Sequence, residues 1–269
     1  MTAAQAPQTG ESIPVTFVET GEGRNRQRLA MRLRAGETHS EAPGIVWLGG
    51  FKSDMLSTKA ARLDQWAAGQ GRACLRFDYS GHGESSGRFE DGAIGAWFAE
   101  SLAMIRSQTT GPQILVGSSM GGWIALLAAR ALAELGETNR LAGMALIAPA
   151  VDFTQELMWP RMPQAAREEI EAKGVWMRPS EYSPEPYPVT RALFEDGRKH
   201  LLLGGIIRSH CPVHILQGMK DPDVPHAHAL RLMQQMPSDV VTLTSIRDGD
   251  HRLSREEDIA RLLGVVAGM

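Results

Sequence analysis

The order of apolar and polar residues changes character about 45 residues into the chain. Residues 13–19 (IPVTFVE) and 28–34 (RLAMRLR) alternate apolar and polar side chains, which is typical of strands buried on one face. The turn-rich GEGRN between them predicts a hairpin, and residues 1–12 are expected to form a loose tail. Short continuous apolar runs then replace the alternation, and they predict parallel strands buried on both faces. These predicted strands cover residues 45–50, 73–78, 114–117, 144–150, 213–218 and 240–246.

Segments with helical spacing separate these runs. In residues 92–107, for example, apolar side chains recur at steps of three and four. Ser254 and Glu257 have the spacing of a capping box at the start of the last helix. Alternating strands and helices predict an α/β fold, with a mostly parallel central sheet, right-handed crossovers and helices on both faces. The predicted helices cover residues 57–69, 92–107, 120–135, 228–236 and 254–268.

The alternation breaks at residues 152–209, which are rich in Pro, Met, Trp and charge. An insertion of this length in a strand–helix array predicts a cap or lid, so residues 1–269 are expected to form one domain. Trp159 and Trp176 are the candidate substrate-binding residues of this cap. They could line an acyl-binding groove or form the cap's own small core, and the same holds for Met158, Met162 and Met177.

A candidate nucleophile lies in the stretch LVGSSMGGW, residues 115–123. Gly117, Ser119 and Gly121 fit the pattern G-x-S-x-G, with an apolar run before it and an Ala/Leu-rich helix after it. In that context the serine sits on a strained turn that projects its hydroxyl from the sheet, and the two glycines allow close backbone approach. Ser118 lacks such a pair, because Val116 and Met120 stand where glycines would be needed. The alternative is a glycine-rich helix start without chemistry.

A serine nucleophile needs a base, and the base needs an acid that orients it. Where the serine lies in a G-x-S-x-G turn between a strand and a helix, the acid follows the serine along the chain and the histidine comes last. His251 follows the last strand, and Asp221 follows the strand 213–218 in the turn QGMKDPDVP. Asp223 is the second candidate for the acid and Asp152 the third. A turn or N-cap role is the alternative for each aspartate.

Two backbone N–H groups are expected to bind the oxyanion. One belongs to Met120, directly after the nucleophile. The other is expected from Phe51, in the loop WLGGFKSDM after the first parallel strand, where Gly49 stands at a position usually held by His.

Other histidines are expected to be structural. His82, in DYSGHGES, is predicted to pack the loop near the site. His226 and His228 are spaced like some metal pairs, but no third ligand has suitable spacing, so we expect them to be exposed at a helix start. We therefore predict no metal and no cofactor.

Composition narrows the classes of function and location. The net charge of −3 argues against nucleic-acid binding, which usually requires a patch of basic residues. No apolar run reaches the length of a membrane span, and the polar N-terminus has no secretory signal. Cys74 and Cys211 form no CxxC pair, which favours a reducing compartment. A cytoplasmic location is expected, and the oligomeric state is not indicated.

The chain resembles the α/β-hydrolase family from end to end. More narrowly it is similar to the mitochondrial α/β-hydrolase-domain-10-like group of acyl-protein thioesterases and acyl-glucuronide esterases. The stretches that carry the resemblance are CLRFDYSGHGES, GPQILVGSSMGGW, EAKGVWMRPSEYS, GMKDPDVP and DHRLS.

The resemblance implies a Ser119–His251–Asp221 triad that cleaves carboxylic esters or thioesters, with a small molecule or an acylated protein as substrate. The organellar members have a long targeting extension that this sequence does not show, so a bacterial cytoplasmic relative is expected. The alternatives are another reaction on the same fold, such as a peptidase or a lipase, and a non-catalytic binding protein.

Overall fold

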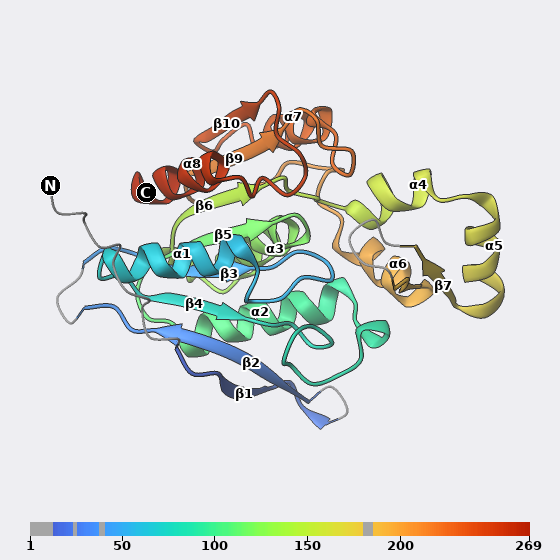
Figure 1. Cartoon of the computed structure of the whole chain (residues 1–269), viewed down its shortest axis with the longest axis horizontal. Coiled ribbons are helices and arrows are strands. Elements are labelled where there is room, and N and C mark those ends of the chain that lie inside the picture. Colours follow the sequence, from blue (N-terminus) through green and yellow to red (C-terminus); the bar gives the residue numbers. More distant parts are fainter. Residues whose placement is uncertain (1–12, 24–25, 38–40, 180–184) are drawn as a thin grey trace, which may run out of the picture.

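The structure, a computed structural model, describes residues 13–23, 26–37, 41–179 and 185–269. The tail expected over residues 1–12 lies outside these ranges. An eight-stranded sheet has the order β1-β2-β4-β3-β5-β6-β9-β10, and Figure 1 shows it running through the centre of the molecule. Its strands are β1 (Thr16–Thr20), β2 (Gln27–Arg34), β3 (Gly44–Leu48), β4 (Cys74–Phe77), β5 (Gln113–Ser118), β6 (Leu141–Ile147), β9 (Val213–Gly218) and β10 (Val241–Ile246).

Strand directions agree with the two patterns in the sequence. β1 and β2 form the predicted antiparallel hairpin, and β2 also runs antiparallel to β4. The pairs from β4 through β3, β5, β6 and β9 to β10 are all parallel. The strand predicted over 144–150 ends earlier, at Ile147, because Ala148 takes a positive φ of 44° that a ladder does not accommodate.

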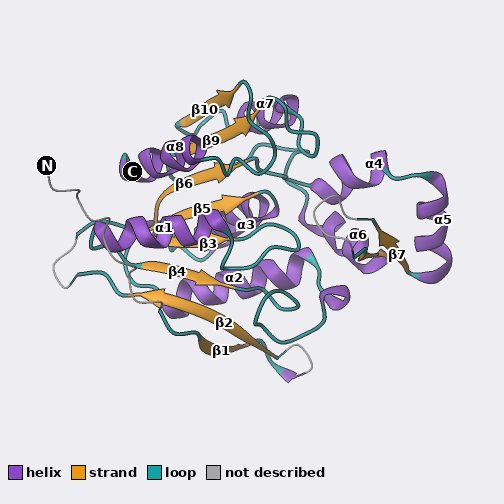
Figure 2. Cartoon of the chain, in the orientation of Figure 1, coloured by secondary structure: helices purple, strands orange, loops and turns teal. Residues whose placement is uncertain are grey.

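Helices cover both faces of the sheet, as Figure 2 shows in purple against the orange strands. Alternate residues of β3 point to opposite faces, so Val46 and Leu48 join one buried cluster while Ile45 and Trp47 join another. The first cluster includes apolar residues of α2, α3 and α7, and the second includes those of α1 and α8. These helices are α1 (Thr58–Gly69), α2 (Ile94–Gln108), α3 (Met120–Glu134), α7 (His226–Gln234) and α8 (Glu256–Ala267). Short 3₁₀ turns cover Phe89–Asp91, Thr138–Arg140 and Arg198–His200.

The prediction of a capping box at the start of α8 is wrong. Arg255 occupies the N-cap position, and no side chain caps the helix there. Ser254 lies one residue before the N-cap, and its hydroxyl donates to the carbonyl of Arg252 at 3.0 Å and accepts from the Lys59 ammonium. Arg255 instead bonds the Asp258 carboxylate in the first turn at 2.8 Å.

Residues 152–209 hold several short elements between β6 and β9. After a π-helical turn (Thr154–Met158) come α4 (Trp159–Arg161), α5 (Gln164–Lys173), β7 (Val175–Arg178), β8 (Tyr187–Thr190) and α6 (Arg191–Gly197). β7 and β8 pair antiparallel, separate from the main sheet. Figure 1 shows α4, α5, α6 and β7 beyond the arrowheads of the parallel strands, at the carboxyl edge of the sheet. Across the described ranges no helix has the length and apolar character needed to cross a membrane.

Candidate active site

Ser119 lies at the sharp turn between β5 and α3. Its φ of 54° and ψ of −116° are sparsely populated by any residue with a side chain. Three backbone hydrogen bonds hold it there: its N–H donates to Ile147 at 2.8 Å, and its carbonyl accepts from Gly122 at 2.9 Å and Ala150 at 3.0 Å. The hydroxyl is thereby fixed at the carboxyl edge of the sheet, as the G-x-S-x-G pattern predicts.

Close backbone contacts explain why both flanking positions of that pattern are glycine. A Cβ on Gly117 would stand 2.4 Å from the carbonyl oxygen of Gly121. One on Gly121 would stand 2.0 Å from the carbonyl oxygen of Leu48, at the end of β3. Helix α3 therefore packs so close to the strand ends that only glycine fits at both positions.

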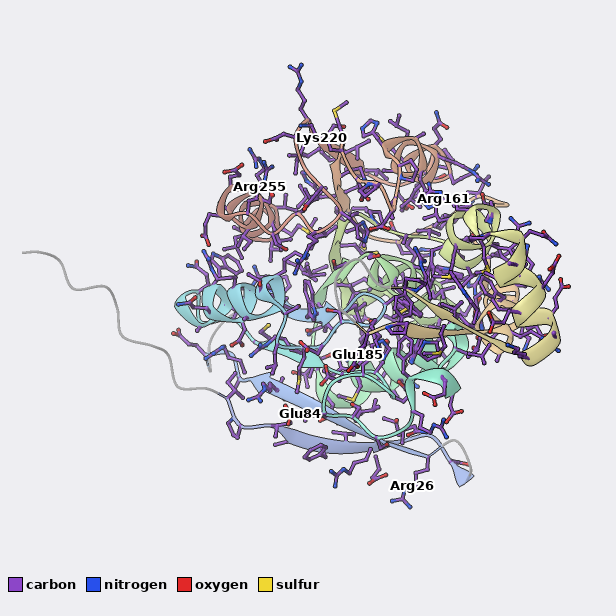
Figure 3. The ribbon with its side chains drawn as sticks, turned by 45° about the vertical axis from the view of Figure 1, so that its right-hand side comes forward. Arg26, Glu84, Arg161, Glu185, Lys220 and Arg255 are labelled. Carbon is purple, nitrogen blue, oxygen red and sulfur yellow. The ribbon has the colours of Figure 1, made fainter. Side chains whose placement is uncertain are left out.

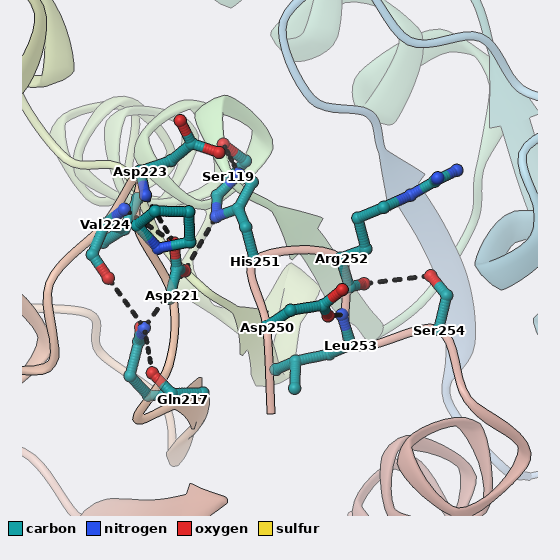
Figure 4. Close-up of polar contacts among 12 residues, drawn as sticks. Ser119, Gln217, Asp221, Asp223, Val224, Asp250, His251, Arg252, Leu253 and Ser254 are labelled. Carbon is teal, nitrogen blue, oxygen red and sulfur yellow. Dashed lines mark hydrogen bonds and ion pairs between the residues drawn. The ribbon is translucent and has the colours of Figure 1, made fainter. Parts of the chain in front are cut away.

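Ser119, His251 and Asp221 form a continuous chain of hydrogen bonds (Figure 4). His251 Nε2 is 3.1 Å from Ser119 Oγ, and His251 Nδ1 is 2.8 Å from Asp221 Oδ2. Because a carboxylate only accepts, Nδ1 carries the proton and Nε2 presents its lone pair to the serine hydroxyl. This is the tautomer that a general base toward serine requires.

Both carboxylate oxygens of Asp221 accept hydrogen bonds that hold the side chain in place. Its side chain is fully buried, whereas that of His251 is 17% exposed. Oδ1 accepts the N–H groups of Asp223 at 2.9 Å and Val224 at 2.8 Å. Oδ2 also accepts Gln217 Nε2 at 3.2 Å, as Figure 4 shows. The turn after β9 therefore folds around the carboxylate and aims it at His251.

The other two aspartates have different surroundings. A carboxylate oxygen of Asp223 lies within 4.8 Å of a carboxylate oxygen of Asp221 and of a ring nitrogen of His251. The buried Asp152 accepts the backbone N–H groups of Leu202 at 2.9 Å and Leu203 at 2.8 Å, at the end of the insertion. Burial raises the pKa of Asp152. Asp221 is thus the aspartate that accepts the hydrogen bond of His251 Nδ1.

Asp221, Asp223 and His251 could also hold a metal ion on spacing alone, and they form the one such group in the described part of the chain. Asp221 and His251 already bond each other, and Asp221 accepts two further N–H groups. This arrangement suits proton transfer better than metal coordination.

The loop that carries His251 is held by polar groups whose roles no sequence motif indicates. The Lys59 ammonium donates to the Arg252 carbonyl and to Ser254 Oγ, and burial lowers its pKa to about 8. Asp250 Oδ1 accepts the N–H of Leu253 at 2.9 Å. Among the polar residues that hold the site in place, only Gln217, which bonds Asp221, could have been noticed in the sequence, because it is a polar residue inside the apolar run VHILQG.

The loop after β3 passes alongside the nucleophile. A Cβ built on Gly50 would lie 3.5 Å from Ser119 Cβ and 3.3 Å from the carbonyl oxygen of Ser118. Phe51 follows, and its ring packs against Phe89 at 4.9 Å and Phe153 at 5.5 Å between centroids. Both expected oxyanion donors, on Phe51 and Met120, are therefore on backbone that adjoins Ser119.

Trp159 and Trp176 are both half-buried against the larger apolar cluster. The Trp159 ring stands 5.0 Å from that of Phe194, with the Arg167 guanidinium 5.5 Å from its centroid, so it has partners within the insertion. Trp176 lies on β7. Arg161, labelled in Figure 3, donates to the carbonyls of Pro222 at 3.1 Å and Asp223 at 2.8 Å, which ties α4 to the turn that holds Asp221.

The two histidines at the start of α7 have different surroundings. His226 Nε2 is 2.7 Å from Ser245 Oγ. His228 is buried, so its expected exposure is wrong: it shares the inward face of α7 with Ala229 and Leu232. His82 is buried in the loop after β4, as predicted.

Residues 42–263 match the alpha/beta hydrolase family. The chain belongs to this family. It is 37% identical over 224 residues to palmitoyl-protein thioesterase ABHD10, mitochondrial, from Homo sapiens, covering 83% of this chain and 71% of that protein. The predicted family and the predicted enzyme class are thereby confirmed.

Two solved structures superpose on most of the chain. A protein from Agrobacterium vitis S4, provisionally described as a hydrolase, is 47% identical with a TM-score of 0.91, covering 96% of this chain and 99% of that one. Alpha/beta hydrolase domain-containing protein 10 from mouse is 33% identical with a TM-score of 0.82, covering 95% and 97%. The predicted fold is confirmed.

Proposed function

We propose that the chain is a serine hydrolase of carboxylic esters or thioesters that works through an acyl-enzyme. The observation that carries the proposal is the hydrogen-bond chain Ser119–His251–Asp221, with 3.1 and 2.8 Å links, on a strained turn. Its similarity to palmitoyl-protein thioesterases favours acyl substrates.

The proposed reaction follows from the positions of these groups. Ser119 Oγ attacks the acyl carbon while His251 Nε2 takes its proton, and Asp221 stabilises the imidazolium. The N–H groups of Met120 and Phe51 donate to the oxyanion, and the positive end of α3 lies beside it. His251 then protonates the leaving alcohol or thiol, and water releases the acid by the same steps.

Residues 152–209 are proposed to act as the cap that selects the acyl group. The hydrogen bonds from Arg161 to the turn 222–223 support this role, because they join the insertion to the site. Trp176 is the better candidate for acyl contact, since Trp159 is engaged with Phe194.

The proposed location is a reducing compartment. Cys74 and Cys211 are both free cysteines. The cytoplasm remains the prediction from the sequence, whereas the ABHD10 relatives are mitochondrial by name.

The test is turnover of matched oxygen esters and thioesters of one acyl chain, with rapid-quench mass spectrometry of the protein. The proposal expects a covalent acyl adduct on the chain and release of the free acid. Binding of these substrates without any adduct or acid would favour a non-catalytic protein. Cleavage of peptides alone would favour the peptidase alternative.

A further inference from the structure

His82 makes two directed hydrogen bonds that the Ser119–His251–Asp221 chain does not use. It lies in the turn after β4 and is only 4% exposed. Nδ1 is 3.2 Å from the carbonyl oxygen of Ser80, and Nε2 is 3.2 Å from the backbone nitrogen of Lys52. A carbonyl only accepts and an amide N–H only donates, so the ring is neutral with its proton on Nδ1.

The residue at the other end of this bond is strained. Lys52 has a φ of 62°, in the left-handed region that residues with side chains rarely adopt. It directly follows Phe51, whose N–H is the proposed oxyanion donor. The orientation of the peptide before Lys52, and hence of the backbone at Phe51, depends on what holds the Lys52 N–H.

The His82 ring is itself immobilised. Its centroid lies 5.1 Å from those of Phe89 and Trp97, both edge to face, and 5.5 Å from that of Tyr79. Trp97 Nε1 donates to the Ser80 carbonyl at 3.1 Å, the same oxygen that orients His82. A fixed ring can hold the Lys52 N–H in one direction.

We propose that His82 is a positioning residue that holds the oxyanion loop in its strained form, so that the Phe51 N–H points at the carbonyl attacked by Ser119. The inference rests on the proposed function. Its rival is a purely structural role, in which His82 fills space in the aromatic cluster and any apolar side chain would serve.

Two variants separate these roles. His82→Leu removes the acceptor but keeps an apolar side chain, whereas His82→Gln can still accept the Lys52 N–H through its amide oxygen. Misplacing one oxyanion donor costs less than deleting it, so we expect kcat of His82→Leu to fall about 10- to 100-fold with KM nearly unchanged. His82→Gln should retain most of the turnover. Affinity for a boronic acid that mimics the tetrahedral adduct should fall in proportion to kcat.

Wild-type kcat and boronate affinity in His82→Leu, whatever its melting temperature, would overturn the proposal. An inactive wild-type protein would instead remove the proposed function, so the two failures are distinguishable. If His82→Leu does not fold, ¹⁵N NMR of the wild-type histidines decides. Protonated Nδ1 and unprotonated Nε2 on His82 are expected, and the opposite tautomer would overturn the proposal.

Discussion

At the scale of single residues, backbone strain collects around the site. Lys52, Ser119, Asp152 and Leu253 all have positive φ values. Such conformations cost about 1–3 kcal/mol each and persist only where the surroundings fix them. Here hydrogen bonds do so, from the Lys52 N–H to His82 and from the Leu253 N–H to Asp250. The fold thus stabilises a geometry that the sequence would not adopt locally.

Glycine at position 121 is expected to be essential. Gly121→Ala places a Cβ 2.0 Å from the Leu48 carbonyl oxygen, so α3 must move away from β3 and carry Ser119 with it. We expect loss of turnover and a clear drop in the free energy of unfolding. Gly264→Ala is the matched control, because nothing lies within 4 Å of its Cβ in α8, and it should stabilise by about 0.5–1 kcal/mol. Chemical denaturation and ester turnover measure both, and an active, stable Gly121→Ala would contradict the elbow geometry.

Asp221 is expected to be the acid that orients His251. Asp221→Asn loses the carboxylate that fixes the tautomer, and a comparable change in a serine protease lowers kcat about 10⁴-fold. Asp223→Asn should be much milder, because the contact with His251 Nδ1 at 2.8 Å belongs to Asp221. Steady-state kinetics of both variants decide, and reversed effects would assign the acid to Asp223.

At the scale of elements, Arg161 links the insertion to the site, because it donates to the turn after β9. Asp152 joins the two ends of the insertion, because it accepts the N–H groups of Leu202 and Leu203. None of the proposed catalytic residues lies in residues 152–209. Changes there should therefore alter which acyl groups react more than the reaction itself.

Trp176 is expected to contribute to acyl selection. Trp176→Ala should raise KM for long acyl esters while acetyl-ester turnover stays nearly unchanged, because one large apolar contact discriminates by about 10- to 200-fold. The measurement is kcat/KM across p-nitrophenyl esters of increasing chain length.

Trp159→Ala is the companion variant. Its ring packs on Phe194, so it should lower the melting temperature and reduce all esters alike. The same uniform loss in Trp176→Ala would mean that Trp176 only supports the insertion.

Most elements were predictable because hydrophobic periodicity reports burial directly. The parallel strands and their helices lie within a few residues of their predicted bounds. The start of α8 was not predictable, because Arg255 and Ser254 both found other partners. Among the site residues, Ser119 was identifiable from its glycines, whereas Lys59 and Asp250 act through contacts that fix the loops only in the folded chain.

At the scale of the whole molecule, buried ionisable groups make stability depend on pH in opposing directions. Burial lowers the pKa of His82 to about 4 and also lowers those of His214 and His228. These groups bind protons more readily when unfolded, so stability falls as pH drops below about 6.5. Burial raises the pKa values of Asp78 and Glu100, which adds stability as pH falls.

Replacing His82 isolates its part of this dependence. Between about pH 6.5 and its folded pKa of about 4, His82 should cost the wild type up to about 3 kcal/mol. His82→Gln cannot titrate, so its free energy of unfolding should fall less over the same range. Urea denaturation at pH 7, 6, 5 and 4.5 measures the difference, and parallel curves would mean that His82 is protonated equally in both states.

The central claim is that Ser119, activated by His251 and Asp221, is the nucleophile. The most direct measurement is labelling by a fluorophosphonate probe, with the modified residue mapped by peptide mass spectrometry in the wild type, Ser119→Ala and Ser118→Ala. The two serines are neighbours, but only Ser119 contacts His251, at 3.1 Å. The account predicts one adduct, on Ser119, that disappears in Ser119→Ala and persists in Ser118→Ala. An adduct on Ser118, or a folded wild-type protein that does not label, would contradict it.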